Sequence, residues 1–230
     1  MSLKAISPCL FSILISLVVV ACSKAPSDVE WRHYNGDWGG TKFSELDQIN
    51  TSNVKELELV WRYRVPDFVE GKNTAIQTNP LMADGILYLI TVGQKLVAMK
   101  PDTGEELWMF DPYYGSGATG KSRAMLYWEN GDEQRIFYGA ANGYFCLNAK
   151  TGKLIESFAE NGRLDLTKDL DHDGITRRFD ARGPGVIYDD LLILGGSVGE
   201  GPHQANPGHI RAFDIRTGER KWIFHTVPHP

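Results

Sequence analysis

The sequence predicts an all-β fold made of repeated units, of the kind found in β-propellers. Three segments repeat one pattern, in which a strand is followed by a Thr-Gly turn and a second strand: 98–108, 146–153 and 212–222. The repeat spans roughly 45–65 residues, which is typical of propeller blades. Because one blade cannot bury both of its faces alone, neighbouring repeats are expected to pack against each other.

Strands and turns alternate along most of the chain. Asp, Asn, Thr and Gly separate short apolar runs that are rich in β-branched and aromatic residues, as expected for strands joined by tight turns. Before the first repeat, residues 51–57 predict one helical turn, and alternating apolar residues predict a strand over 57–65. The further strands are predicted at 86–91, 95–99, 106–110, 135–140, 144–147, 154–158, 185–194, 210–214 and 220–224. A polar insertion over 161–182 separates the second repeat from the third.

Composition is that of an ordinary globular domain. The formal net charge is -5, and 42% of the residues are hydrophobic. An acidic balance argues against a nucleic-acid partner. The Trp residues after the Thr-Gly turns, together with Trp61, are expected to pack between neighbouring blades rather than to take part in catalysis.

The N-terminus has the features of a lipoprotein signal peptide over residues 1–21. An apolar run over 9–20 is too short to span a bilayer as a helix, which needs about 20 residues. The run ends in Val-Val-Ala followed by Cys22. Cys22 is therefore the expected lipidation site, with residues 22–30 as a linker, and the protein is expected to be exported and anchored at the periplasmic face of the cell envelope. An ordinary secretory signal with an incidental Cys22 is the alternative.

Cysteine usage gives no disulfide framework. Cys9 lies in the signal peptide and Cys22 at the expected lipidation site, which leaves Cys146 alone in an apolar strand. Cys146 is expected to act as a small buried hydrophobic residue.

The repeats resemble the tryptophan-docking motif of PQQ-dependent (quinoprotein) alcohol and glucose dehydrogenases, Ala-x-Asp-x-x-Thr-Gly-Lys-x-x-Trp. The third repeat fits it nearly throughout, whereas Lys100 replaces the Asp in the first and Glu156 replaces the Trp in the second. Residues 31–50 and 79–88 also resemble this family, and residues 208–214 and 222–228 resemble its glucose-dehydrogenase branch. The resemblance covers residues 31–230.

The resemblance implies an eight-bladed propeller with PQQ on its axis beside a Ca²⁺ ion. Residues 31–230 would supply about three blades, which is an incomplete propeller domain. The family's catalytic Asp has no counterpart in this sequence. The chain is therefore expected to be the N-terminal part of a longer dehydrogenase, or the product of a truncated gene, and to be inactive alone.

The same resemblance implies a set of cofactor residues. Glu200 follows a Gly/Ser-rich strand end and matches the family's Ca²⁺ ligand, while Arg123 matches an Arg that approaches the quinone oxygens. Ser197 and Gly199 would line the cofactor pocket. Gln77 stands where some members have a Glu, and Arg182 departs from the expected Thr but offers a cation for an anionic group.

A second Ca²⁺ site is an open alternative in the polar insertion. Asp169, Asp171, Asp173 and Asp180 follow a spacing typical of Ca²⁺-binding loops. The twelfth position carries Asp instead of Glu, and no flanking helices are predicted, so a solvated acidic loop is the competing interpretation.

Two function classes remain open from the sequence. The first is a PQQ-dependent oxidoreductase that oxidises a sugar or alcohol hydroxyl, as in glucose dehydrogenase, and passes electrons to a quinone or cytochrome of the respiratory chain. The alternative is a cofactor-free lipoprotein propeller that serves as a scaffold in outer-membrane protein assembly. The identity of the sugar or alcohol and of the electron acceptor does not follow from the sequence.

Overall fold

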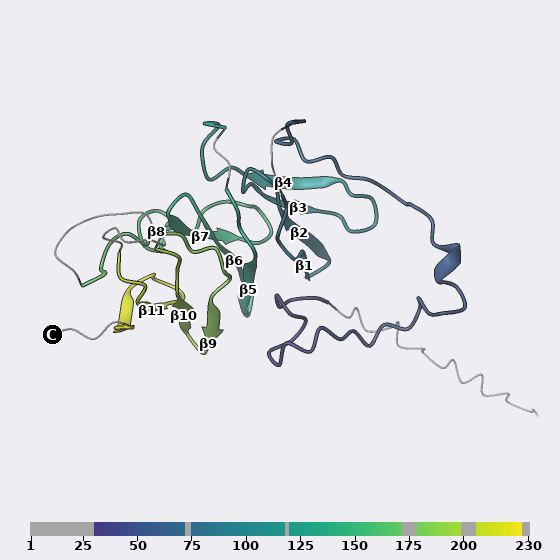
Figure 1. Cartoon of the computed structure of the whole chain (residues 1–230). Coiled ribbons are helices and arrows are strands. Elements are labelled where there is room, and N and C mark those ends of the chain that lie inside the picture. Colours follow the sequence, from purple (N-terminus) through teal and green to yellow (C-terminus); the bar gives the residue numbers. More distant parts are fainter. Residues whose placement is uncertain (1–29, 72–74, 118–119, 172–178, 199–205, 227–230) are drawn as a thin grey trace, which may run out of the picture.

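The computed structural model describes residues 30–71, 75–117, 120–171, 179–198 and 206–226. The strands form three four-stranded antiparallel sheets, each in chain order (Figure 1). The first contains β1 (Leu81–Ala83), β2 (Ile86–Ile90), β3 (Leu96–Met99) and β4 (Glu106–Phe110). The second contains β5 (Met125–Asn130), β6 (Glu133–Ala140), β7 (Gly143–Asn148) and β8 (Arg163–Asp165). The third contains β9 (Val186–Tyr188), β10 (Leu191–Leu194), β11 (Ile210–Asp214) and β12 (Arg220–Phe224).

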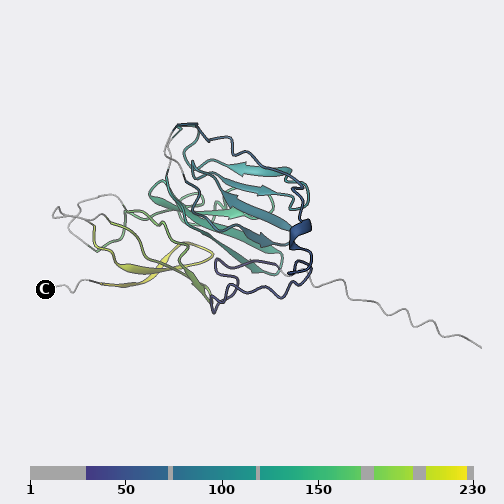
Figure 2. The ribbon, with the colours of Figure 1, turned by 45° about the vertical axis from the view of Figure 1, so that its right-hand side comes forward.

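The three sheets are consecutive blades of a propeller. Contacts between strands of different sheets join β1 to β5 and β5 to β9, which are the first strands of successive sheets. The first strands therefore lie innermost, and the sheets fan out from them side by side (Figures 1 and 2). This arrangement confirms the predicted all-β, propeller-type fold.

Helical structure is minor in the described part of the chain. Its one helical element is a 3₁₀ turn at Val54–Glu56, which lies within the predicted helical segment 51–57. Asn53 precedes this turn in place of the expected Thr51 or Ser52. Among the described residues, no helix is long and apolar enough to cross a membrane.

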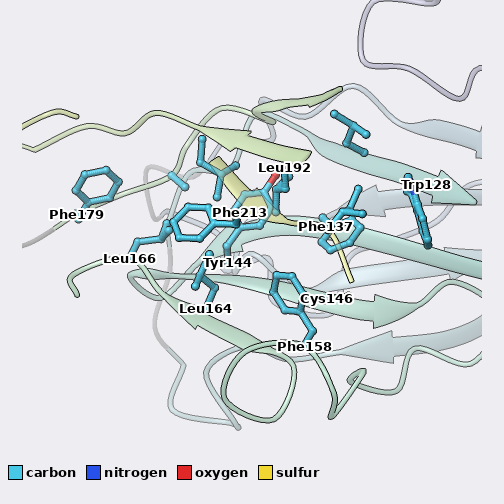
Figure 3. Packing of buried hydrophobic residues seen from close by; sticks show 14 of the residues in the cluster. Trp128, Phe137, Tyr144, Cys146, Phe158, Leu164, Leu166, Phe179, Leu192 and Phe213 are labelled. Atoms are coloured by element: carbon cyan, nitrogen blue, oxygen red, sulfur yellow. The ribbon is translucent and has the colours of Figure 1, made fainter. Parts of the chain in front are cut away.

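Two hydrophobic clusters hold the blades together. One lies between the first and second sheets and includes Tyr88, Tyr138 and Phe145, all with 1% or less of their surface exposed. The other lies between the second and third sheets and includes Phe137 from β6 and Phe213 from β11 (Figure 3). Each fully buried side chain of this size contributes about 1.5–3 kcal/mol by leaving water. Cys146 belongs to the second cluster and is fully buried, as predicted.

Two of the three expected tryptophans make a hydrogen bond to the start of a Thr-Gly turn. Trp61 donates its indole N–H to the carbonyl oxygen of Pro101 at 2.9 Å, and Trp108 donates to the carbonyl oxygen of Ala149 at 3.1 Å. Both acceptors begin a Thr-Gly turn of the following repeat. Trp222 on β12 keeps 39% of its surface exposed. The predicted packing between neighbouring blades is thus confirmed for Trp108, whereas Trp61 attaches a segment outside the three sheets to the first blade.

The second repeat ends differently from the prediction. Residues 154–158 are not a strand: Leu154 makes only an isolated bridge to Leu147, and β8 is formed further on by Arg163–Asp165. The chain instead turns so that Ala159 packs against Gly218 and donates its amide to the carbonyl of Thr217 at 2.8 Å. Ala159 thus takes the place on the next Thr-Gly turn that a Trp takes in the first repeat.

Two further strand predictions need correction. Residues 57–65 form no strand, because they belong to none of the three sheets and Leu59 and Val60 remain 73% and 82% exposed. Residues 185–194 form a hairpin of two strands, β9 and β10, instead of one strand. The chain reverses at Asp189, whose φ of 48° is suited to a tight turn.

Candidate functional site

Four of the predicted site residues meet at one end of the inner strands. The amide of Arg123, which precedes β5, donates to the carbonyl of Arg182, which precedes β9, at 2.9 Å. Asp180 and Ser197 exchange two backbone hydrogen bonds of 2.9 and 2.8 Å, which join the start of β9 to the end of β10. Residues that lie 59 positions apart (Arg123 and Arg182) and 17 positions apart (Asp180 and Ser197) in the sequence are therefore fixed next to each other by their backbones.

Gln77 lies near the same end, before β1. The hydroxyl of its neighbour Thr78 donates to the carbonyl of Ser122 at 2.7 Å, which ties the start of the first inner strand to the segment that carries Arg123. The side chains of Gln77, Arg123 and Ser197 are exposed, and that of Arg182 is half-buried. These four side chains are thus available to a bound molecule at the inner edge of the blades.

A cavity of about 640 Å³ opens beside this group, lined by segments of the first and second sheets and by the segment that leads into the third. Its lining comes from the loop after β2, the segment before β5, the turn between β6 and β7, the strand β8 with the residues after it, and the segment before β9. The lining residues are Gln94, Tyr113, Gly120, Lys121, Gly139, Ala140, Ala141, Asn142, Arg163, Asp165, Thr167, Asp180, Ala181 and Arg182.

Two glycines let the walls of this cavity come together. Gly139 on β6 lies so close to the carbonyl of Ala181 that a Cβ would collide with it, and Gly120 stands in the same relation to the side chain of Gln94. The side chain of Gln94 also accepts a hydrogen bond from the Tyr113 hydroxyl. The close approach of Gly139 to Ala181 and of Gly120 to Gln94 therefore shapes the walls of the cavity.

Charged groups in the lining are only partly paired. Arg182 forms an ion pair with Asp180 at 3.0 Å. Asp165 accepts two hydrogen bonds from Thr167, at 3.0 and 2.7 Å. Partial burial would raise the pKa of Asp165, but these hydrogen bonds and the nearby cation of Arg163 outweigh it and hold the pKa below its usual value. Both carboxyl groups are therefore engaged with partners of this chain.

The described acidic residues of the possible Ca²⁺ loop interact with basic residues. The carboxylate of Asp171 accepts from Arg220 at 2.9 Å and lies 3.3 Å from the ring of His225, and the bond from Arg220 lowers its pKa. Asp169 presents its backbone carbonyl to Arg220, and Asp180 faces Arg182. Among the described residues, no three His, Cys, Asp or Glu side chains are grouped to hold a metal. Asp173, Gly199, Glu200 and Cys22 lie outside the described residues.

Sequence reasoning did not find Lys121 and Arg163 as site residues. Lys121 stands two positions before Arg123, and Arg163 begins a strand that was assigned to the polar insertion. Neither belongs to a recognisable motif. Both line the same cavity, although 42 positions separate them in the sequence.

Comparisons with known proteins agree with this architecture. Residues 31–230 match the family described as "PQQ: Glucose/ethanol/alcohol dehydrogenase, beta-propeller domain". The chain is 27% identical to a quinate/shikimate dehydrogenase (quinone) from Acinetobacter baylyi over 90% of its length, and 30% identical to a quinoprotein glucose dehydrogenase from Escherichia coli over 86%. The structure of quinohemoprotein alcohol dehydrogenase from Comamonas testosteroni superposes on 88% of the chain with a TM-score of 0.69 and 25% identity.

These similarities cover nearly the whole chain but a minority of each relative. The chain spans 29%, 27% and 28% of the lengths of those three proteins. The match to the family nevertheless runs unbroken through all three sheets, from residue 31 to residue 230. The chain therefore belongs to the β-propeller domain family of the PQQ-dependent glucose, ethanol and alcohol dehydrogenases.

Proposed function

We propose that this protein is a PQQ-dependent dehydrogenase that oxidises a hydroxyl group of a sugar or alcohol and delivers electrons to a quinone or cytochrome. The observation that carries this proposal is the convergence of Arg123, Arg182, Ser197 and Gln77 at one end of the inner strands. Relatives named as quinoprotein glucose dehydrogenase and quinate/shikimate dehydrogenase support the reaction class.

The donors at this end of the blades fit PQQ, which bears several carboxylates and carbonyls. Arg123 and Arg182 supply planar guanidinium groups that pair with carboxylates in a bidentate way. Gln77 and Ser197 supply neutral donors that suit carbonyl oxygens. Because their backbones are joined by hydrogen bonds, Arg123 and Arg182 would hold an anionic ligand with little rearrangement.

When bound, PQQ supplies the oxidising chemistry by accepting two electrons from the substrate carbinol. The residues of this chain would bind and orient it: Arg123 and Arg182 neutralise carboxylate charge, and Ser197 donates from the strand end after β10. Glu200 would supply a carboxylate ligand to Ca²⁺, a hard cation that prefers oxygen ligands.

The site of action is part of the proposal. Lipidation of Cys22 would tether the protein at the periplasmic face of the envelope, because several acyl chains on one residue anchor firmly. A membrane quinone or a cytochrome would then be within reach as the electron acceptor.

PQQ titration of the protein in the presence of Ca²⁺ tests the proposal. Binding is followed by quinone absorbance, and activity by dye reduction with glucose and simple alcohols. Arg123→Ala is expected to weaken PQQ binding by about tenfold or more, the loss of one charge-assisted hydrogen bond. Glu200→Gln is expected to reduce the effect of Ca²⁺ on that binding, since it removes one charge from a hard-cation site.

Arg62→Ala is the matched control, because Arg62 is exposed in the segment before β1 and is not among the residues of the candidate site. It should bind PQQ as the parent does. A folded protein that binds no PQQ would contradict the proposal and leave the cofactor-free scaffold as the better account.

A further inference from the structure

The cavity beside the candidate cofactor residues contains two cations that the function so far leaves unused. Lys121 is exposed at its mouth, and Arg163 is half-buried in its wall. In the described part of the chain, neither forms an ion pair with a carboxylate. A cavity of about 640 Å³ lies within the range of small-molecule sites, which is about 300–1,000 Å³.

Arg163 is held in place by neutral groups. Its guanidinium donates to the carbonyl of Ala141 at 3.0 Å and lies 5.9 Å from the centre of the Phe145 ring. Its side chain crosses β7 at Gly143, where a Cβ would come within 2.7 Å of the guanidinium nitrogen Nε. The cation is thus preorganised by a carbonyl, a ring and a glycine, and none of them neutralises its charge.

The charge of the lining determines what kind of ligand it favours. Three cations, Lys121, Arg163 and Arg182, face two carboxylates, Asp165 and Asp180, so that the lining has a net charge of +1. The whole chain has the opposite sign, -5. Since both carboxylates are engaged by Thr167 and Arg182, an entering anion would meet Lys121 and Arg163 first. One net positive charge suits a monocarboxylate better than a phosphate monoester, which carries close to two negative charges.

The cavity also has a defined position relative to the candidate cofactor residues. Arg182 lines the cavity, and its carbonyl accepts the amide of Arg123. Asp180 lines the cavity as well and is bonded through its backbone to Ser197. A ligand anchored between Lys121 and Arg163 would therefore extend toward the end of the inner strands where the proposed cofactor residues lie.

We propose that this cavity binds the carboxylate of the substrate between Lys121 and Arg163, so that the compound oxidised is a hydroxy acid or sugar acid. This inference rests on the proposed dehydrogenase function for its chemistry, but the binding site itself rests on the cavity and its charges. Recognition of a charged group in a cavity separate from the reacting hydroxyl would select acids over neutral sugars of the same length.

Calorimetric binding of two matched probes to the cofactor-free protein tests the inference. Gluconate and sorbitol share a six-carbon polyol chain and differ in one terminal carboxylate. Gluconate is expected to bind at least about tenfold more tightly than sorbitol, and Lys121→Gln and Arg163→Gln are each expected to remove about tenfold of that preference. Arg163→Gln retains an amide for the carbonyl of Ala141, and melting temperatures verify that both variants are folded.

Lys100→Gln is the matched control. Lys100 is an exposed lysine outside the cavity whose amine pairs with Glu105 at 2.7 Å, so that this variant makes the same charge change elsewhere. It should bind gluconate as the parent does. Equal affinity for gluconate and sorbitol, or an equal loss in all three variants, would overturn the inference.

A parallel PQQ titration separates this site from the cofactor's own carboxylates. If Lys121→Gln and Arg163→Gln weaken PQQ binding and leave gluconate unaffected, the cavity belongs to the cofactor and the inference is wrong. Gluconate binding that persists in a protein unable to bind PQQ would support the anion site and contradict the dehydrogenase function.

Discussion

The indole of Trp108 on β4 lies directly against Gly152, in the Thr-Gly turn of the second sheet. A Cβ on Gly152 would stand 2.5 Å from the ring, and the φ of this residue is +67°. The turn therefore needs glycine for two reasons, the left-handed backbone and the close approach of the ring. This contact explains why the Thr-Gly sequence and the Trp of the preceding repeat occur together.

Gly152→Ala is expected to lower the free energy of unfolding by about 2–5 kcal/mol. A left-handed alanine costs roughly 1–2 kcal/mol, and forcing a methyl group against a packed ring typically adds about 1–3 kcal/mol. Urea denaturation measures the loss. Gly131→Ala is the control, because Gly131 has a φ of +58° with nothing within 4 Å of its Cβ position. If both variants lose the same stability, the Trp108 contact contributes nothing.

The repeat pattern predicted most strands but not where the second blade ends. Thr-Gly turns and apolar runs are local signals, and they located β2, β3, β4, β6, β7, β11 and β12. Glu156, which replaces the Trp, marks where the second repeat departs from the pattern, and there Ala159 packs on Gly218. The contact between Ala159 and Gly218 involves the neighbouring blade, so the local sequence carries no signal for it. The local sequence therefore predicted a strand over 154–158 that does not form.

Residues 57–65 illustrate the limit of alternation as a signal. Their apolar side chains alternate as in a strand, yet Leu59 and Val60 are exposed. A strand exists only where another strand accepts its hydrogen bonds, and alternation reports only the preference for a half-buried surface. Side-chain hydrogen bonds attach this segment to the first blade, from Trp61 to the carbonyl of Pro101 and from the Tyr63 hydroxyl to Glu106.

Arg135 links the second blade to the third, and its removal is expected to be costly. It is 3% exposed, and its Nη1 donates to the carbonyls of Ile215 and Arg216 at 3.1 and 3.0 Å. Arg135→Met keeps the bulk of the side chain and leaves both carbonyls without this donor, at about 1–3 kcal/mol for a buried unsatisfied group. Thermal and urea unfolding should therefore show a loss of about 2–4 kcal/mol.

Lys221→Met is the control for Arg135→Met. Lys221 pairs with Glu219 at 2.7 Å on the surface of β12, and exposed ion pairs contribute about 0–1 kcal/mol. A loss for Arg135→Met as small as that for Lys221→Met would show that the two carbonyls find water or other donors.

The candidate site was predicted in part from the sequence. Resemblance to the family indicated Arg123, Arg182 and Ser197, and hydrogen bonds bring their backbones to one place. Lys121 and Arg163 could not be predicted, because neither belongs to a motif and 42 positions separate them in the sequence, so that only the folded chain shows that they line one cavity. The acidic spacing over 169–180 left a Ca²⁺ loop and a solvated acidic loop as alternatives, and in the described residues Asp171 and Asp180 each form an ion pair with an arginine.

Cys22 is expected to anchor the protein through its lipid. Cys22→Ser removes the thiol that is acylated, so the variant should remain unprocessed or appear in the soluble fraction instead of the membrane fraction. Cell fractionation after a salt wash measures how much protein stays with the membrane, and detection of incorporated fatty acid measures lipidation. Cys146→Ser is the control, because Cys146 is buried and should leave fractionation unchanged. Membrane retention of a processed Cys22→Ser variant would contradict the lipoprotein assignment.

Cys146 on β7 is expected to resist alkylation in the folded protein. Burial raises the pKa of this thiol to about 12, an effect that the neighbouring Arg135 only partly offsets. Since the thiolate is the reactive form, only about one in ten thousand of these thiols is ionised at pH 8. Mass spectrometry of the peptide containing Cys146 after brief iodoacetamide treatment should find almost no label in native protein and complete label in urea.

The same thiol adds a pH dependence to stability. The unfolded chain releases the Cys146 proton near pH 9, whereas the folded protein retains it until about pH 12, so the contribution is complete below pH 9 and is lost as the pH rises toward 12. Cys146→Ala lacks this group, and its free energy of unfolding should fall less steeply above pH 9 than that of the parent. Other buried groups are common to both proteins and cancel in the comparison. Parallel pH profiles, or rapid labelling of native Cys146, would show that the thiol is accessible to solvent and that the second and third blades separate readily.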